Sequence, residues 1–166
     1  MNRAEFLDKL LRSFESYYDI KRMGVSAPFA AEAEFHTHDE QYFLVKSATI
    51  SEAESNEYVF FASTEKLDKE SFQELDRAAW ETGLSRICPH KNHRNSDITL
   101  YILADQISEE VFSMIPKQRH YKSYCFSLQG WTSYRLVAIE LTSGRSAYNR
   151  QGRDLKKLVC NILNHS

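Results

Sequence analysis

The chain has 166 residues, 42% of them hydrophobic, and a formal net charge of −2 from 21 Lys and Arg against 23 Asp and Glu. This length supports one hydrophobic core, so we expect a single globular domain over residues 1–166. Glycine and proline are scarce, at 5 and 3 residues, which argues against long linkers. No apolar run approaches the roughly 18 residues that a membrane-spanning helix needs.

Cysteine content and the start of the chain point to one compartment. Cys88, Cys125 and Cys160 are odd in number and widely spaced, a pattern typical of reduced thiols rather than of a disulfide framework. Residues 1–5 lack the apolar core of a signal peptide. The sequence therefore predicts a cytoplasmic protein without a membrane partner.

Apolar spacing and capping signals predict ten elements. Asn2 followed by Glu5 matches a capping box, and apolar residues then recur at helical spacing. In chain order we expect a helix over 3–18, strands over 31–38, 40–50 and from 57 onward, a helix over 68–84, a strand over 98–104, a short helix from 108, strands over 120–128 and 132–141 joined by a turn at 129–131, and a helix over 149–164. The first three strands have the short connections of an antiparallel meander.

The run 98–104 is apolar on both faces, which is typical of a central strand covered on both sides. The helices on either side of it in the sequence are spaced for right-handed crossovers. The order αβββαβαββα thus predicts an α+β domain, with a mixed sheet of about six strands and helices on both faces.

Several short segments carry a resemblance to a known family: Glu57 to Phe61, Ser96 to Asp105, Gly130-Trp131 with Arg135 to Ala138, Thr142 to Arg145, and Tyr148 to Arg153. With them, nearly the whole chain resembles a domain of unknown function found in uncharacterised proteins of clostridia and related anaerobes. That family has no assigned catalytic residues, so the resemblance implies no activity.

The predicted order over residues 3–104 is also similar to the core of the restriction-endonuclease-like fold, which implies DNA cleavage, repair or binding. Active members hold Mg²⁺ with an Asp near one strand and an acid two residues before a Lys on the next. Here Leu44 stands two residues before Lys46, so the motif departs from the pattern. A nuclease of this kind would need other carboxylates, and the candidates are Glu34, Glu40 and Glu57.

Two clusters could ligate a transition metal. The first consists of every second residue along one predicted strand face: Glu32, Glu34, His36 and His38. The second cluster places three ligands in six residues: Cys88, His90 and His93. The alternatives are the solvated face of an outer strand for the first and a polar connecting loop for the second.

Charge divides unevenly along the chain. Residues 1–85 carry 9 Lys and Arg against 17 Asp and Glu, a balance of −8, whereas residues 86–166 carry 12 against 6, a balance of +6. A basic surface is the footprint of contact with phosphate or with an acidic surface. The candidate binding residues are Lys91, Arg94, Lys117, Arg119, Lys122, Arg150, Arg153 and Lys157. The alternative is an ordinary solvated helix face.

These observations favour a non-enzymatic module that binds nucleic acid or an acidic protein through its basic C-terminal surface. The acidic half could equally pair with the basic half of a second copy. The alternative is a divalent-metal-dependent, nuclease-like enzyme in which the three candidate glutamates converge in one cleft with Mg²⁺ or Mn²⁺. A third hypothesis is a small-molecule pocket lined by Tyr101, Trp131 and Tyr134. We predict no other cofactor.

Overall fold

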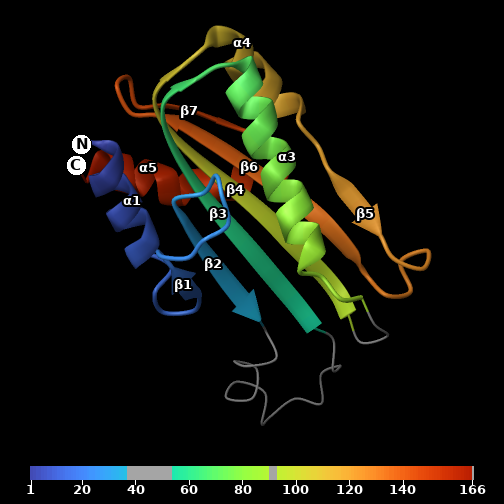
Figure 1. Cartoon of the computed structure of the whole chain (residues 1–166). Helices are drawn as coiled ribbons and strands as arrows, with labels where there is room; N and C mark the ends of the chain where they lie inside the picture. The colour runs from blue at the N-terminus through green and yellow to red at the C-terminus, as the bar shows by residue number, and fades with distance from the viewer. Residues whose placement is uncertain (37–53, 90–92, 166) are drawn as a thin grey trace.

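The computed structural model describes residues 1–36, 54–89 and 93–165 as one mixed α+β domain (Figure 1). Its elements are α1 (Arg3–Arg12), β1 (Asp19–Lys21), β2 (Ala31–His36), β3 (Glu54–Leu67), α3 (Lys69–Ser85), β4 (His93–Ile107), α4 (Glu109–Met114), η1 (Ile115–Lys117), β5 (Tyr121–Ser123), β6 (Trp131–Glu140), β7 (Arg145–Tyr148), η2 (Arg153–Leu155) and α5 (Lys156–Asn164).

Seven strands form one open sheet in the order β1-β2-β3-β4-β6-β5, and β7 also pairs with β6. The central pairs β3–β4 and β4–β6 are parallel, whereas the outer pairs are antiparallel. Parallel pairing needs a crossover between the strands, and α3 and α4 lie in those two connections. The predicted mixed sheet is confirmed, with one strand more than expected.

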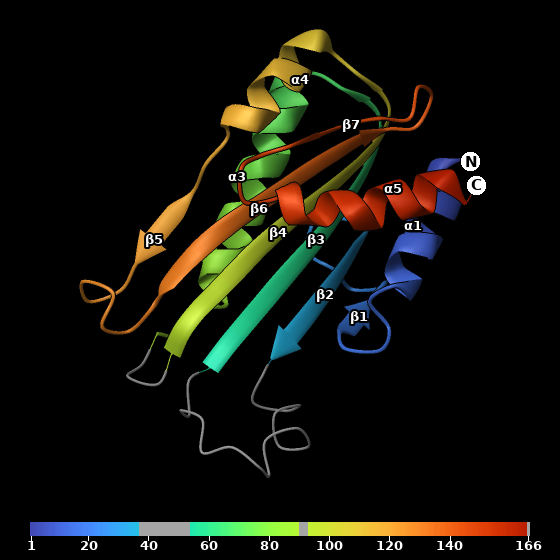
Figure 2. The same cartoon turned by 180° about the vertical axis from the view of Figure 1, so that it is seen from behind.

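Helices cover both faces of the sheet, as predicted. In Figure 1, α3 lies in front of the sheet, and Figure 2 shows α5 crossing the opposite face beside α1. The side chains of β4 alternate between two buried clusters, with Leu100 and Ile102 on the α3 side and Tyr101 and Leu103 on the α1 and α5 side. The central strand is therefore covered on both sides. No described helix combines the length and apolar character needed to span a bilayer.

Several predicted boundaries are wrong. The first helix ends at Arg12 rather than at residue 18, because the chain turns at Ser13, whose backbone N–H bonds back to the last turn. The strand expected over 120–128 is limited to β5, since a tight turn begins at Tyr124. The predicted loop 86–96 already contains the start of β4. The strand expected over 40–50 lies outside the described residues.

The sequence patterns also missed two short strands. β1 and β7 have 3 and 4 residues, too few to show a clear alternation. The last helix is shorter than expected, because residues 153–155 form a 3₁₀ turn before α5 begins. These short pieces matter for the site, because β7 and η2 enclose the loop that carries Arg150.

Candidate functional site

One edge of β6 carries two strands placed end to end. β4 pairs with residues 131–140 along one side of β6, so both other partners must use the opposite side. There, β5 pairs with residues 131–133 and β7 with residues 137–140. The stretch 134–136 is left between them without a partner strand.

Asn149 fills this gap with its side chain. Its Oδ1 accepts the backbone N–H of Leu136 at 2.9 Å, and its Nδ2 donates to the carbonyl of Tyr134 at 2.9 Å. The same amide donates to the carbonyl of Gln118 at 3.2 Å and accepts the N–H of Gly152 at 2.8 Å. The amide thus uses two donor and two acceptor positions, and joins the chain before β5 to the chain after β7.

Gly152 allows this loop to lie close against β6. A Cβ atom at this position would stand 2.6 Å from the carbonyl oxygen of Leu136, inside normal contact. The backbone at Gly152 has φ −86°, which any residue adopts. The requirement for glycine here is therefore one of space rather than of conformation.

These contacts enclose a cleft of about 170 Å³, lined by Pro116, Lys117, Gln118 and Arg119 from one segment and by Asn149, Arg150 and Gln151 from the other. We call it the basic cleft. Lys117, Arg119 and Arg150 are exposed, and across residues 1–36, 54–89 and 93–165 none of them forms an ion pair. The cleft therefore presents three cations that no described carboxylate neutralises.

Gln118 and His120, which alternate along the chain with Lys117 and Arg119, hold one wall of the basic cleft in place. Gln118 and His120 each lie 2.7 Å from a carboxylate oxygen of the buried Asp76, which belongs to α3. The same carboxylate accepts the hydroxyl of the buried Tyr134 at 2.7 Å. Lys117 and Arg119, the residues on either side of Gln118, remain exposed. A network under α3 therefore positions the cations without contacting them.

Other arginines of the basic half are neutralised. Arg135 lies 2.8 Å from Asp97 and 3.5 Å from Asp154, and Arg145 lies 2.6 Å from Glu109. In contrast, Arg153 and Lys157 are exposed and have no ion-pair partner within the described part of the chain. The same holds for Lys122, whose ammonium lies 5.4 Å from the ring centre of Tyr124. Lys91 and the side chain of Arg94 lie outside the described structure.

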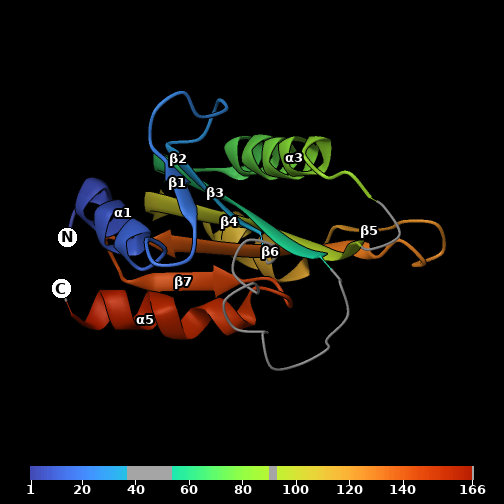
Figure 3. The same cartoon turned by 90° about the horizontal axis from the view of Figure 1, so that it is seen from below.

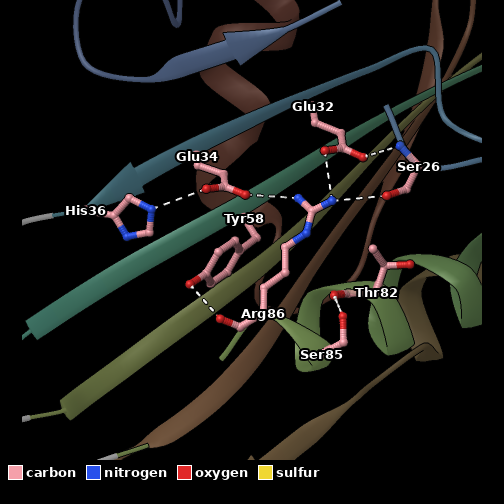
Figure 4. A network of polar contacts seen from close by, with 8 residues as sticks. All are labelled: Ser26, Glu32, Glu34, His36, Tyr58, Thr82, Ser85 and Arg86. Atoms are coloured by element: carbon pink, nitrogen blue, oxygen red, sulfur yellow. Dashed lines mark hydrogen bonds and ion pairs between the residues drawn. The ribbon is translucent and has the colours of Figure 1, made fainter. Parts of the chain in front are cut away.

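Arg86 forms ion pairs with two of the carboxylates on the strand face that was predicted to bind a metal. Its guanidinium binds Glu32 at 2.9 Å and Glu34 at 3.0 Å (Figure 4). The network borders a larger cavity of about 400 Å³ beside β1. Asp19 and Lys21 also line this cavity, so its lining lacks the excess of positive charge found in the basic cleft and is a weaker candidate for an anionic ligand.

The two candidate catalytic carboxylates that the structure describes, Glu34 and Glu57, do not meet. Glu34 pairs in register with Tyr58 and Phe35 with Glu57, so Glu34 and Glu57 point to opposite faces of the sheet. Glu57 accepts hydrogen bonds from Tyr18 and Thr99 on the α1 and α5 side. Burial raises the pKa of Glu57 despite these bonds and the nearby Arg135. Glu40 lies outside the described residues.

Of the candidate metal ligands, the structure describes the side chains of His36 and Cys88. The ring of His36 contacts Asn56 at 2.8 Å and Glu34 at 3.3 Å, and Cys88 is exposed. His38, His90 and the side chain of His93 lie outside the described structure. Among the residues that can be placed, no three His, Cys, Asp or Glu side chains gather in a metal-binding group.

The aromatic pocket hypothesis is wrong in its geometry. Tyr134 and Tyr101 are both fully buried, the first in the core under α3 and the second in the core under α1 and α5. The sheet separates them, so they cannot line one pocket with Trp131. Sequence reasoning also missed Asn149, Gly152 and Asp76, whose roles depend on distant partners. The turn pattern Asn149-Arg150-Gln151-Gly152 was the one local signal available.

The fold and site define a single-domain α+β protein with a basic cleft at one edge of a mixed sheet. A family model described as a domain of unknown function (DUF8052) matches residues 2–161, and the chain belongs to that family. The predicted resemblance to an uncharacterised domain is thereby confirmed. Neither a curated protein nor a solved structure matches the chain. The resemblance to restriction endonucleases stays a prediction.

Proposed function

We propose that this protein is a non-enzymatic module that binds an acidic protein through the basic cleft. The observation that carries the proposal is the set of three exposed cations, Lys117, Arg119 and Arg150, which have no ion pair with any described residue and lie on two segments that a buried amide joins. Because hydrogen bonds already hold the backbone of both segments in place, little backbone entropy is lost when a partner binds, which favours recognition.

The overall charge favours an acidic protein over nucleic acid. Domains that bind nucleic acid usually have a pI above about 9, whereas this chain has a pI of about 6.3. The cations are local to one edge of the sheet, and acidic residues elsewhere would repel a long, stiff polyanion such as duplex DNA. A flexible acidic chain, such as an acidic segment of a protein, could contact the cleft without approaching those acids.

The proposal places the protein in the cytoplasm. Cys88, Cys125 and Cys160 are free thiols, and the first two are exposed. Exposed thiols persist in a reducing compartment and are readily oxidised outside it. The free thiols therefore support a cytoplasmic location whatever the partner is.

Binding to polyglutamate, heparin, duplex DNA and RNA at low and raised salt tests the proposal. We expect salt-sensitive binding to polyglutamate that the Lys117→Gln/Arg119→Gln/Arg150→Gln variant loses. The matched control is Arg12→Gln/Lys66→Gln/Arg77→Gln, which removes three exposed cations without ion pairs in the described structure. Equal losses of polyglutamate affinity in both variants would refute the cleft as the binding site. Stronger binding to DNA or RNA than to polyglutamate would refute an acidic protein as the partner.

A further inference from the structure

The turn between β5 and β6 has an unusual backbone. Cys125, Phe126 and Ser127 are consecutive and have φ values of 48°, 53° and 68°, the left-handed region that residues with a Cβ rarely adopt. Hydrogen bonds within the turn fix this conformation, among them Leu128 N–H to the Cys125 carbonyl at 3.0 Å and Tyr124 N–H to the Gly130 carbonyl at 3.0 Å. The turn is therefore a defined structure.

This backbone presents apolar side chains to water. Phe126 is 99% exposed and Leu128 80% exposed. Seven large apolar residues are exposed in the described structure, and four of them belong to this hairpin: Tyr121, Phe126, Leu128 and Trp131. Figures 1 and 3 show the hairpin extending past the end of α3, away from the helices. Apolar exposure is thus concentrated on one projecting element.

In the sequence, the charged residues on either side of the hairpin are all basic. No Asp or Glu occurs from residue 111 to residue 139, whereas Lys117, Arg119, Lys122 and Arg135 lie in that stretch. Arg135 is neutralised by Asp97 and Asp154, and the other three have no ion pair in the described structure. A partner that covers the turn would therefore meet an apolar tip flanked by cations.

We infer that Phe126 and Leu128 are anchors that pack against apolar side chains of the acidic protein bound by the basic cleft. This inference rests on the proposed function and adds a second contact to it. Protein interfaces combine bulky apolar anchors with charges at the rim, and a few anchors contribute most of the affinity. Tyr121, Phe126 and Trp131 have aromatic faces on which bases could stack, but Leu128 at the tip has none, so the pair Phe126 and Leu128 fits an apolar protein surface better than nucleic acid.

The probe for this surface is a phage-displayed library of random 12-residue peptides selected on the full-length protein. We expect the selected peptides to carry bulky apolar residues next to Asp or Glu. Affinities of synthetic versions are then measured by fluorescence anisotropy. Phe126→Ser/Leu128→Ser should weaken binding by about tenfold or more, whereas Phe126→Leu/Leu128→Met, which keeps two apolar side chains, should retain it.

A control variant and a stability measurement make the result decisive. Tyr17→Ser/Met23→Ser removes two other exposed apolar side chains, 64% and 85% exposed, and should leave peptide binding unchanged. Because Tyr17, Met23, Phe126 and Leu128 are all exposed, this variant and the Phe126→Ser/Leu128→Ser variant should both keep the wild-type melting temperature. Equal peptide affinity for the wild type and the Phe126→Ser/Leu128→Ser variant would overturn the inference.

Other outcomes separate this inference from the proposed function. If the Phe126→Ser/Leu128→Ser variant loses duplex DNA, RNA or anionic vesicle binding instead of peptide binding, the acidic protein is the wrong partner. If it abolishes a concentration-dependent dimer in sedimentation, the anchors serve a second copy and the inference fails. Wild-type protein that does not bind polyglutamate refutes the basic cleft, whereas the anchors are judged by their effect on peptide affinity.

Discussion

Replacement of Asn149 should weaken both the fold and the basic cleft. In Asn149→Ala, the buried N–H of Leu136 loses its acceptor, and the carbonyls of Tyr134 and Gln118 lose a donor. One buried polar group without a partner costs about 1–3 kcal/mol, so the change should lower the free energy of unfolding by roughly 2–4 kcal/mol. For a domain of this size, that corresponds to a fall in melting temperature of roughly 5–15 °C.

A second substitution at this position tests the direction of the hydrogen bonds. Asn149→Asp keeps the acceptor for Leu136 but turns a carboxylate oxygen toward two carbonyls. Burial and these carbonyls should raise the pKa of the new carboxyl above its unfolded value of about 3.9, so the folded state binds the proton more tightly. Its stability should fall as pH rises through the folded pKa.

Urea denaturation at several pH values measures both effects. We expect Asn149→Asp to be the less stable variant at pH 7.5 and to approach or exceed the stability of Asn149→Ala near pH 4. A loss below about 1 kcal/mol in Asn149→Ala would show that water replaces the amide at little cost. A pH-independent difference between the two variants would contradict the assigned donors.

Three further predictions concern other parts of the molecule. Arg86→Met leaves Glu32, 3% exposed, without its cation, and should cost about 3–5 kcal/mol in chemical denaturation; an unchanged stability would show that the pair is replaceable. Gly152→Ala places a Cβ 2.6 Å from the Leu136 carbonyl and should cost about 1–3 kcal/mol in the same assay, with reduced polyglutamate binding. Because the pKa of Glu57 is raised in the folded protein, its contribution to stability is lost as pH rises above about 4.5, so the stability of Glu57→Gln relative to wild type should increase from pH 4.5 to pH 7.5. The opposite trend would refute the buried-carboxyl interpretation.

Periodicity predicted most elements because each signal is local. The alternation at residues 31–36 and the apolar run 98–104 identified strands that the structure contains in β2 and β4. Boundaries were less well predicted. The turn at Tyr124 interrupts a segment rich in aromatic residues that otherwise favours a strand. It depends on three consecutive residues with positive φ, which these residue types do not predict.

The positive charge of the candidate site could be predicted from the sequence, whereas the contacts that bring its residues together could not. Lys117, Arg119 and Arg150 were identified from the excess of basic residues, and the structure brings these three together. Arg153 and Lys157 were grouped with them on the same grounds, but neither is among the described residues that line the cleft. Proximity in sequence therefore says little about which cations share a surface.

The amino-acid sequence is enough to predict a single α+β domain, the order of its main elements and the excess of positive charge after residue 85. Which of these charges remain free, and where they gather, depends on how the chain folds. Arg86 reaches Glu34 across 52 positions, and Asn149 reaches Gln118 across 31. Such pairs depend on strand register and crossover direction, which local periodicity does not encode. For the same reason, Glu34 and Glu57 lie on opposite faces of one sheet, whereas the two halves of the basic cleft meet at its edge.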